Sequence, residues 1–141
     1  MNKLRRFVSM PLADQFLLLE AFCSVAANRV RLSISPARAI RERRSSPRVR
    51  PRLATYQLDR IAGAVRIAGR YVPAATCLTQ ALALQALLTR HGHASSLHIG
   101  VDKGPGRPFG AHAWVRCGDR VMIGGDDSER YAPLLIREER P

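Results

Sequence analysis

The most informative segment of the sequence is Pro73-Ala-Ala-Thr-Cys77-Leu-Thr-Gln-Ala-Leu-Ala-Leu-Gln-Ala-Leu-Leu-Thr-Arg-His-Gly92. From Cys77 to His91 it contains neither Gly nor Pro, and the strong helix formers Ala, Leu and Gln dominate it. Thr76 is suited to cap the start of this helix, and Gly92 suits the position just beyond its end. Because apolar side chains fall on several sides of the helix, we expect it to be the central, buried helix of the domain.

Two amphipathic helices are predicted ahead of this segment. Apolar residues recur at three- and four-residue steps from about residue 12 to about residue 32, and Pro36 is expected to stop that helix. Its expected core face consists of Leu12, Phe16, Leu19, Phe22, Ala26 and Val30. A second helix is predicted from about residue 53 to about residue 70, with Leu58, Ile61, Val65 and Ala68 on its apolar side.

After Gly92 the period of the apolar residues changes from 3.6 to 2. Residues 97–101, 111–117 and 120–123 alternate in this way and predict three short strands, the last two joined by a tight turn at Gly118-Asp119. With a two-residue turn there, His112 would lie opposite Gly125. Helices followed by a small antiparallel sheet define an α+β fold, and we expect the sheet to pack on the Cys77 helix.

Composition and charge suggest a compact core with a basic N-terminal part. Of the 141 residues, 46% are hydrophobic and 24% are charged, which is ordinary for a globular protein. The net charge of +12 is uneven, because residues 1–53 hold 12 Lys or Arg and 3 Asp or Glu. Seven arginines and two prolines lie in residues 38–52, which predicts a solvated linker. We therefore divide the chain into residues 1–53, an N-terminal helix with an Arg-rich linker, and a core of residues 54–141.

The compartment is predicted from cysteine usage and hydropathy. Three cysteines are an odd number and too few for a disulfide framework, so a reducing, cytoplasmic location fits best. The longest uncharged run, Tyr71 to Thr89, contains Pro, Thr and Gln and is too polar for a membrane span.

A cysteine in the first turn of a buried helix has unusual electrostatic surroundings. Free backbone N–H groups and the helix dipole stabilise a thiolate at Cys77, and the same groups can hold the oxyanion of a tetrahedral intermediate. A histidine must then reach the sulfur as base and acid, and His112 opens a strand directly after a Gly- and Pro-rich loop. A lone cysteine in a helix is more often a core residue, and we assign Cys23 and Cys117 to the core.

A carboxylate should orient the imidazole of such a pair. Asp119 would lie at the far tip of the hairpin, whereas Asp126 and Asp127 would lie at the His112 end. If side chains alternate strictly between the two faces of the strand, Asp127 lies on the same face as His112 and is the favoured carboxylate. A bend of the chain at Gly124-Gly125 would change which of the two aspartates lies on that face.

Several of these segments resemble one known family. Pro73-x-x-Thr-Cys77-Leu-x-x-Ala81-Leu-Ala83, together with Leu97-x-Ile99-Gly100-Val101 and Ala111-His112-Ala113-Trp114-Val115, is similar to the transglutaminase-like cysteine protease of lasso-peptide biosynthesis. The resemblance covers nearly the whole chain and implies a transglutaminase/papain-like core with its catalytic residues in the chain order Cys, His, Asp. By this resemblance Cys77 is the nucleophile, His112 is the base and Asp126 is the orienting group.

The function implied by the resemblance is leader removal during the maturation of a ribosomally synthesised peptide. Such a leader peptidase frees the core N-terminus, which a cyclase of asparagine-synthetase type then joins to a side chain as a macrolactam. A chain of this length leaves no room for a leader-binding domain, so we expect the split system, in which a small recognition protein delivers the precursor peptide by its leader region. No cofactor, metal, nucleic acid or membrane span is expected.

Two other functions remain open at this point. One is an acyltransferase or another thiol enzyme on the same fold. The other is a non-catalytic basic module that binds nucleic acid, with Cys77 as a structural residue. The arginine run favours a solvated linker over a nucleic-acid patch, because no aromatic residues are interleaved with it.

Overall fold

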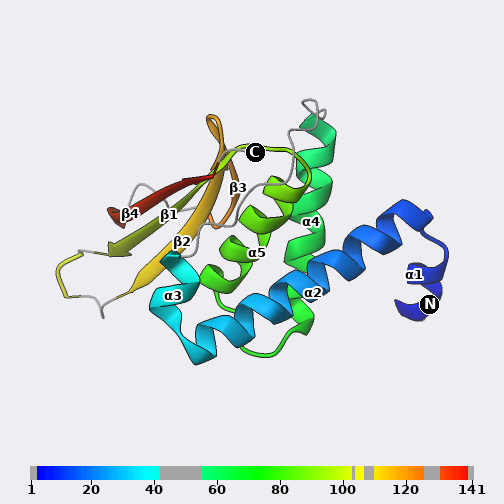
Figure 1. The fold of residues 1–141 in the computed structure, drawn as a ribbon, viewed down its shortest axis with the longest axis horizontal. Helices are drawn as coiled ribbons and strands as arrows, with labels where there is room; N and C mark the ends of the chain where they lie inside the picture. Colours follow the sequence, from blue (N-terminus) through cyan, green and yellow to red (C-terminus); the bar gives the residue numbers. More distant parts are fainter. Residues whose placement is uncertain (1–2, 42–54, 103, 107–109, 126–130, 140–141) are drawn as a thin grey trace.

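The computed structural model describes residues 3–41, 55–102, 104–106, 110–125 and 131–139. Its helices form one layer and its antiparallel sheet forms the other (Figure 1), so the predicted α+β class is confirmed. The helices are α1 (Lys3–Val8), α2 (Leu12–Ile34), α3 (Pro36–Arg41), α4 (Thr55–Tyr71) and α5 (Cys77–Arg90). The strands are β1 (Ser95–Asp102), β2 (Ala111–Cys117), β3 (Arg120–Ile123) and β4 (Tyr131–Glu139). Among the described helices, none combines the length and the hydropathy that crossing a bilayer requires.

Helix α5 lies in the middle of the molecule, as predicted. It packs against α2 and α4 on one side and against β1 and β2 on the other (Figure 1). Leu84, Leu87 and Leu88 are fully buried there. The helix begins with a capping box between Thr76 and Thr79, and it ends before Gly92, whose φ of +81° lies in the left-handed region that favours glycine.

The sheet has the strand order β3-β2-β1-β4, with all neighbours antiparallel. Leu97 and Ile99 of β1 and Ala113 and Val115 of β2 belong to the core that the sheet shares with the helices. Strand β4 was not predicted, because Pro133 interrupts its apolar run and proline is unfavourable inside a strand. It is tolerated at the edge of this sheet, where β4 has β1 as its partner.

A β-bulge changes the register of the β2–β3 hairpin. Cys117 pairs with Arg120, as the two-residue turn predicts. The register then shifts between Val115 and Arg116, so that Val115 pairs with Ile123. The uniform register that placed His112 opposite Gly125 is therefore wrong, and the alternation that favoured Asp127 no longer holds. Asp126 and Asp127 themselves lie outside the described residues, as does the predicted boundary between residues 53 and 54.

Helix α2 has the predicted extent but buries the opposite face. Leu12 is 71% exposed and Phe16 is 69% exposed, so the predicted core face is wrong for most of its members. Phe22 is the exception, because it is half-buried and packs against the core. The buried side chains of α2 are Leu18, Ala21, Ser24, Val25 and Asn28. Two of these are polar and are satisfied by main-chain acceptors: the Ser24 hydroxyl donates to the Ala83 carbonyl at 3.3 Å and the Asn28 amide donates to the Ser24 carbonyl at 2.8 Å. The helix stops before Pro36 as expected, but helix α3 follows at once and includes the start of the predicted linker.

Two adjacent leucines on α2 test this orientation. We expect Leu18→Ala to lower the free energy of unfolding by about 2–4 kcal/mol, because it removes a buried side chain and leaves a cavity. Leu19→Ala should change it by less than about 1 kcal/mol, because Leu19 is half exposed. Urea unfolding followed by circular dichroism measures both values. Equal losses, or a larger loss for Leu19→Ala, would contradict the orientation of α2 described here.

Candidate active site

Cys77 is the first residue of α5, half-buried and packed against the core. The Thr76 hydroxyl accepts a hydrogen bond from the Thr79 N–H at 3.3 Å, and the Thr76 carbonyl accepts one from the Gln80 N–H at 3.1 Å. The N–H groups of Cys77 and Leu78 have no acceptor among the described residues. Two unpaired donors at a helix start provide a position where negative charge on oxygen or sulfur is favourable.

His112 is the second residue of β2 and is held from two sides. Its Nε2 lies 2.5 Å from the carbonyl oxygen of Gly124, and its ring stacks on Tyr131 with the ring centroids 5.1 Å apart. A carbonyl oxygen can only accept a hydrogen bond, so Nε2 carries the hydrogen and donates it. In the neutral imidazole the free lone pair is therefore on Nδ1, which becomes the basic atom.

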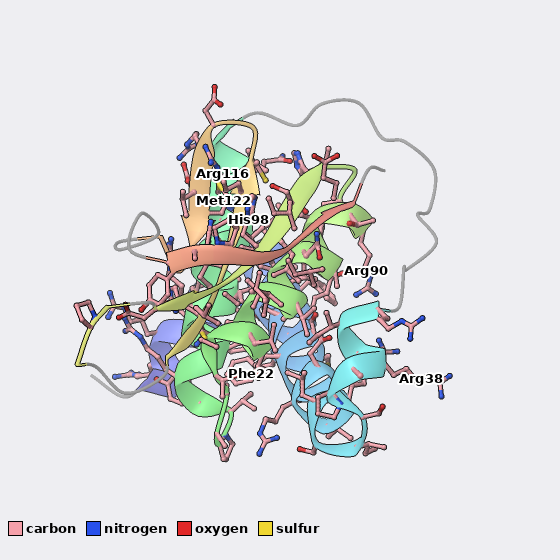
Figure 2. The ribbon with its side chains drawn as sticks, turned by 90° about the vertical axis from the view of Figure 1, so that its left-hand side faces the viewer. Phe22, Arg38, Arg90, His98, Arg116 and Met122 are labelled. Atoms are coloured by element: carbon pink, nitrogen blue, oxygen red, sulfur yellow. The ribbon has the colours of Figure 1, made fainter. Side chains whose placement is uncertain are left out.

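The imidazole of His112 belongs to a cluster of four rings. Trp114 stacks on His98 at 5.4 Å between centroids and lies 6.3 Å from His112 and 6.4 Å from Tyr131. Gly100 allows this approach, since a Cβ at that position would come within 2.7 Å of the Tyr131 Cβ and 3.0 Å of the Trp114 ring. Burial and the nearby Arg116 lower the pKa of His98, so this member of the cluster is neutral at pH 7. Figure 2 shows His98 and Arg116 on the sheet, away from Phe22 in the helical layer.

The relation between the two candidate residues follows from the strands. Helix α5 packs against β2, and the first residues of both lie toward the same end of the molecule (Figure 1). However, successive side chains of a strand point to opposite faces of the sheet, and in β2 it is Ala113 and Val115 that face the helices. His112 and Trp114 therefore lie on the other face of β2. No hydrogen bond joins the Cys77 Sγ to the imidazole within the described residues. The structure thus brings His112 together with Gly124, Tyr131 and Trp114, and Asp126 lies outside the described residues.

Gly124 and Tyr131 were not singled out from the sequence. Gly124 contacts His112 through its main-chain carbonyl, which no side-chain pattern predicts. The only signal in the sequence was the Gly124-Gly125 pair, which indicated an unusual backbone after β3. Tyr131 reaches the site because β4 pairs with β1, which places Tyr131 opposite Asp102. The apolar run that follows Tyr131 was the available signal for this strand.

The other two cysteines differ from each other. Cys23 is exposed, so its assignment to the core is wrong. Cys117 is half-buried and packs against the core, as predicted, and burial raises the pKa of its thiol to about 11 despite the opposing effect of Arg120. Cys117 is therefore protonated at pH 7 and is unsuited to act as a nucleophile.

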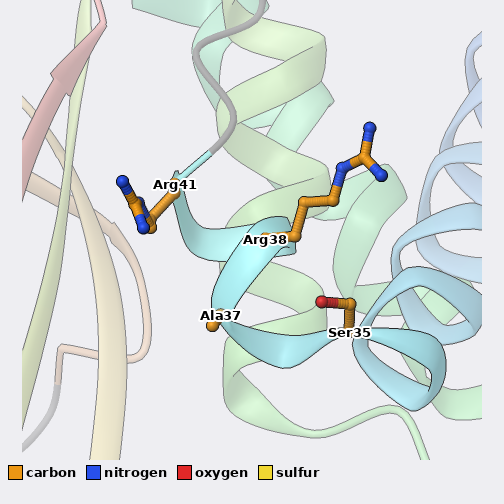
Figure 3. A pocket seen from close by; sticks show the side chains of 4 residues that line it. All are labelled: Ser35, Ala37, Arg38 and Arg41. Atoms are coloured by element: carbon orange, nitrogen blue, oxygen red, sulfur yellow. The ribbon is translucent and has the colours of Figure 1, made fainter.

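A basic cavity of about 340 Å³ lies along α3 and is lined by Ser35, Ala37, Arg38 and Arg41. The side chains of Arg38 and Arg41 point away from each other in Figure 3. Because the two guanidinium groups do not converge, this cavity lacks the paired donors that would hold a phosphate or carboxylate.

Replacement of Gly124 tests the hydrogen bond between the His112 imidazole and the Gly124 carbonyl. Gly124 has a φ of +75°, and a Cβ there would lie 2.5 Å from the Ala113 carbonyl oxygen and 3.3 Å from the His112 Nε2. We expect Gly124→Ala to lower the free energy of unfolding by at least about 2 kcal/mol and to change the imidazole NMR shifts of His112. Gly63→Ala is the matched control, because Gly63 is helical and a Cβ meets nothing within 4 Å. Equal stability and unchanged His112 shifts in both variants would contradict the described contact.

Thiol alkylation tests the environments of the cysteines. With a pKa of about 11, only about one Cys117 thiol in a thousand is ionised at pH 8. We expect iodoacetamide to modify exposed Cys23 readily and to leave Cys117 unmodified until urea is added, as read by peptide mass spectrometry. Rapid modification of Cys117 in the folded protein would contradict its burial.

The family of the chain follows from a comparison with family models. The model described as the transglutaminase-like superfamily matches residues 21–136, from within α2 to within β4. No curated protein and no solved structure gives a significant match. Proteins of this superfamily are typically cysteine proteases or acyltransferases, and the central helix and antiparallel sheet fit their papain-like core. The chain therefore belongs to the transglutaminase-like superfamily, which indicates a cysteine-based enzyme.

Proposed function

We propose that the protein is a cysteine peptidase that removes the leader from a lasso-peptide precursor, with Cys77 as nucleophile, His112 as base and Asp126 as the orienting carboxylate. The observation that carries this proposal is the thiol of Cys77 at the first residue of the central helix, beside two N–H groups that have no acceptor within the described part of the chain. In a transglutaminase-like chain, this is where a nucleophilic thiolate and its oxyanion donors are needed together. The leader specificity rests on the resemblance of the Cys77 and His112 segments to that peptidase family.

The reaction proceeds through a thioester. Nδ1 of His112 takes the thiol proton, and the Cys77 sulfur attacks the carbonyl carbon at the leader–core junction. The N–H groups of Cys77 and Leu78 donate to the oxyanion. When the C–N bond breaks, the His112 imidazolium gives its proton to the leaving amine, which becomes the core N-terminus. Water, deprotonated by His112, then hydrolyses the leader thioester and restores the thiol.

The proposed chemistry requires the two side chains to approach each other. Proton transfer needs the imidazole within roughly 3 Å of the sulfur, and catalytic contacts commonly tighten only when substrate binds. The Gly124 carbonyl supports this proposal, because it keeps the hydrogen on Nε2 and leaves Nδ1 basic. Asp126 follows Gly124 by two residues, and we assign it the stabilisation of the imidazolium once the positive charge forms.

Partners and location complete the proposal. The product amine suits macrolactam formation by a cyclase of asparagine-synthetase type, and a small leader-recognition protein would deliver the precursor. We retain a cytoplasmic location and the division into residues 1–53 and 54–141 as parts of this proposal.

The test compares two cysteine variants on a lasso-peptide precursor presented with its recognition protein. We expect Cys77→Ala to abolish release of leader and core, a loss of at least about 1,000-fold, because no other group supplies the nucleophile. Cys23→Ala is the matched control and should retain full activity, since Cys23 is exposed on α2. Liquid chromatography with mass spectrometry quantifies both products. Leader release by Cys77→Ala at the rate of the unmodified protein would refute the assignment.

An amine trap distinguishes hydrolysis from acyl transfer on the same fold. With hydroxylamine present, an acyl-Cys77 intermediate yields leader hydroxamate, whereas hydrolysis without the trap yields leader acid. A small acyl group on Cys77, with no cleavage of the precursor, would instead identify an acyltransferase.

A further inference from the structure

The outward face of α2 carries an apolar stripe that no described element covers. Its members follow one another at alternating steps of four and three residues, and we name them the outer stripe: Leu12, Phe16, Leu19, Cys23, Ala26 and Val30. All six are exposed, although α2 buries its other face against α4 and α5. This spacing is the one by which a helix packs along a second helix. A monomer rarely exposes a contiguous apolar row of this length without a partner.

A groove adjoins the outer stripe. A cavity of about 670 Å³ lies between α1, α2 and α4, and its apolar lining includes Phe7, Met10, Phe22 and Ile67. Phe22 stands three residues after Leu19 on α2, so the groove and the outer stripe form one continuous apolar surface. Pockets of this size that combine apolar walls with few polar groups are typical binding sites.

The charges around the groove identify the kind of occupant. Arg6 and Arg70 line it, and neither pairs with a carboxylate among the described residues. A second copy of this chain would bring the same arginines to the groove and would itself carry a net charge of +12. Repulsion between the two positively charged copies disfavours self-association. An occupant with carboxylates beside its apolar side chains would be complementary to the groove.

We propose that the outer stripe and the groove bind an acidic amphipathic helix of a partner protein. Its apolar side chains pack along α2 and into the groove, and its carboxylates pair with Arg6 and Arg70. The outer stripe runs from Leu12 to Val30, ~27 Å along α2, so the partner helix makes contact over about five turns. Such a contact buries on the order of 1,200 Å² in total, the lower limit of a specific interface. The proposal does not depend on Cys77 chemistry.

A synthetic probe tests this binding on the full chain. The probe is a fluorescent 21-residue peptide with leucines at heptad positions and glutamates elsewhere, and the control peptide has lysine in place of every glutamate. Fluorescence anisotropy should show saturable binding of the acidic peptide in the micromolar range and no binding of the basic one. Binding should weaken when salt is raised from 0.05 to 0.5 M, because screening reduces the contribution of the arginines.

Paired variants locate the surface. We expect Phe16→Glu with Leu19→Glu, and separately Arg6→Glu with Arg70→Glu, to weaken acidic-peptide binding at least about tenfold. Leu134→Glu on β4 and Arg41→Glu on α3 are the matched controls, because both residues are exposed and neither belongs to the outer stripe or lines the groove. Both variants should bind as the parent does. Circular dichroism verifies that each variant is folded.

Three results of the binding experiments would overturn the proposal. They are equal binding of both peptides, no saturation of the acidic peptide up to millimolar concentration, and equal affinity in the surface variants and the controls. Dimerisation in sedimentation that the Phe16→Glu, Leu19→Glu variant abolishes would assign the surface to a second copy and would also overturn it. None of these results bears on precursor cleavage, so failure here is distinguishable from failure of the proposed peptidase function.

Discussion

The burial of α5 between the other helices and the sheet organises the whole molecule. Its leucines and alanines face helices on one side and strands on the other, so α2, α4, β1 and β2 all pack on the same element. Even Thr79 and Gln85 of this helix are excluded from solvent. Because so many contacts converge on it, the position of Cys77 at its first residue is set by the whole core rather than by a loop. A thiol held in this way is positioned in advance, as the proposed nucleophile requires.

Sequence patterns predicted α5, its caps and the β2–β3 turn correctly, because local propensity and burial point to the same answer there. They failed for the orientation of α2, which is apolar on two opposite faces. The larger side chains Leu12 and Phe16 suggested the wrong core face, whereas the true one includes Ser24 and Asn28. Those two polar residues are compatible with burial only through hydrogen bonds that the sequence does not reveal.

The candidate site was predictable to a similar, partial degree. The sequence located Cys77 at a helix start, and the structure describes that helix start with its capping box. The surroundings of His112 were not predictable, because they depend on a bulge in the hairpin and on β4, a strand that Pro133 concealed. The bulge is an irregularity of strand pairing, and β4 pairs with a distant strand, whereas hydrophobic periodicity does not report which residues pair. The pairing of the thiol with the imidazole stays a proposal for that reason.

The sheet order has a consequence for synthesis on the ribosome. Strand β1 is internal to the sheet, yet its outer neighbour β4 is the last of the described strands in sequence order. During translation β1 and β2 emerge first, and the other edge of β1 remains unpaired until residues 131–139 leave the exit tunnel. An open edge of this kind templates intermolecular pairing, so premature termination before β4 would yield an aggregation-prone fragment with an intact central helix.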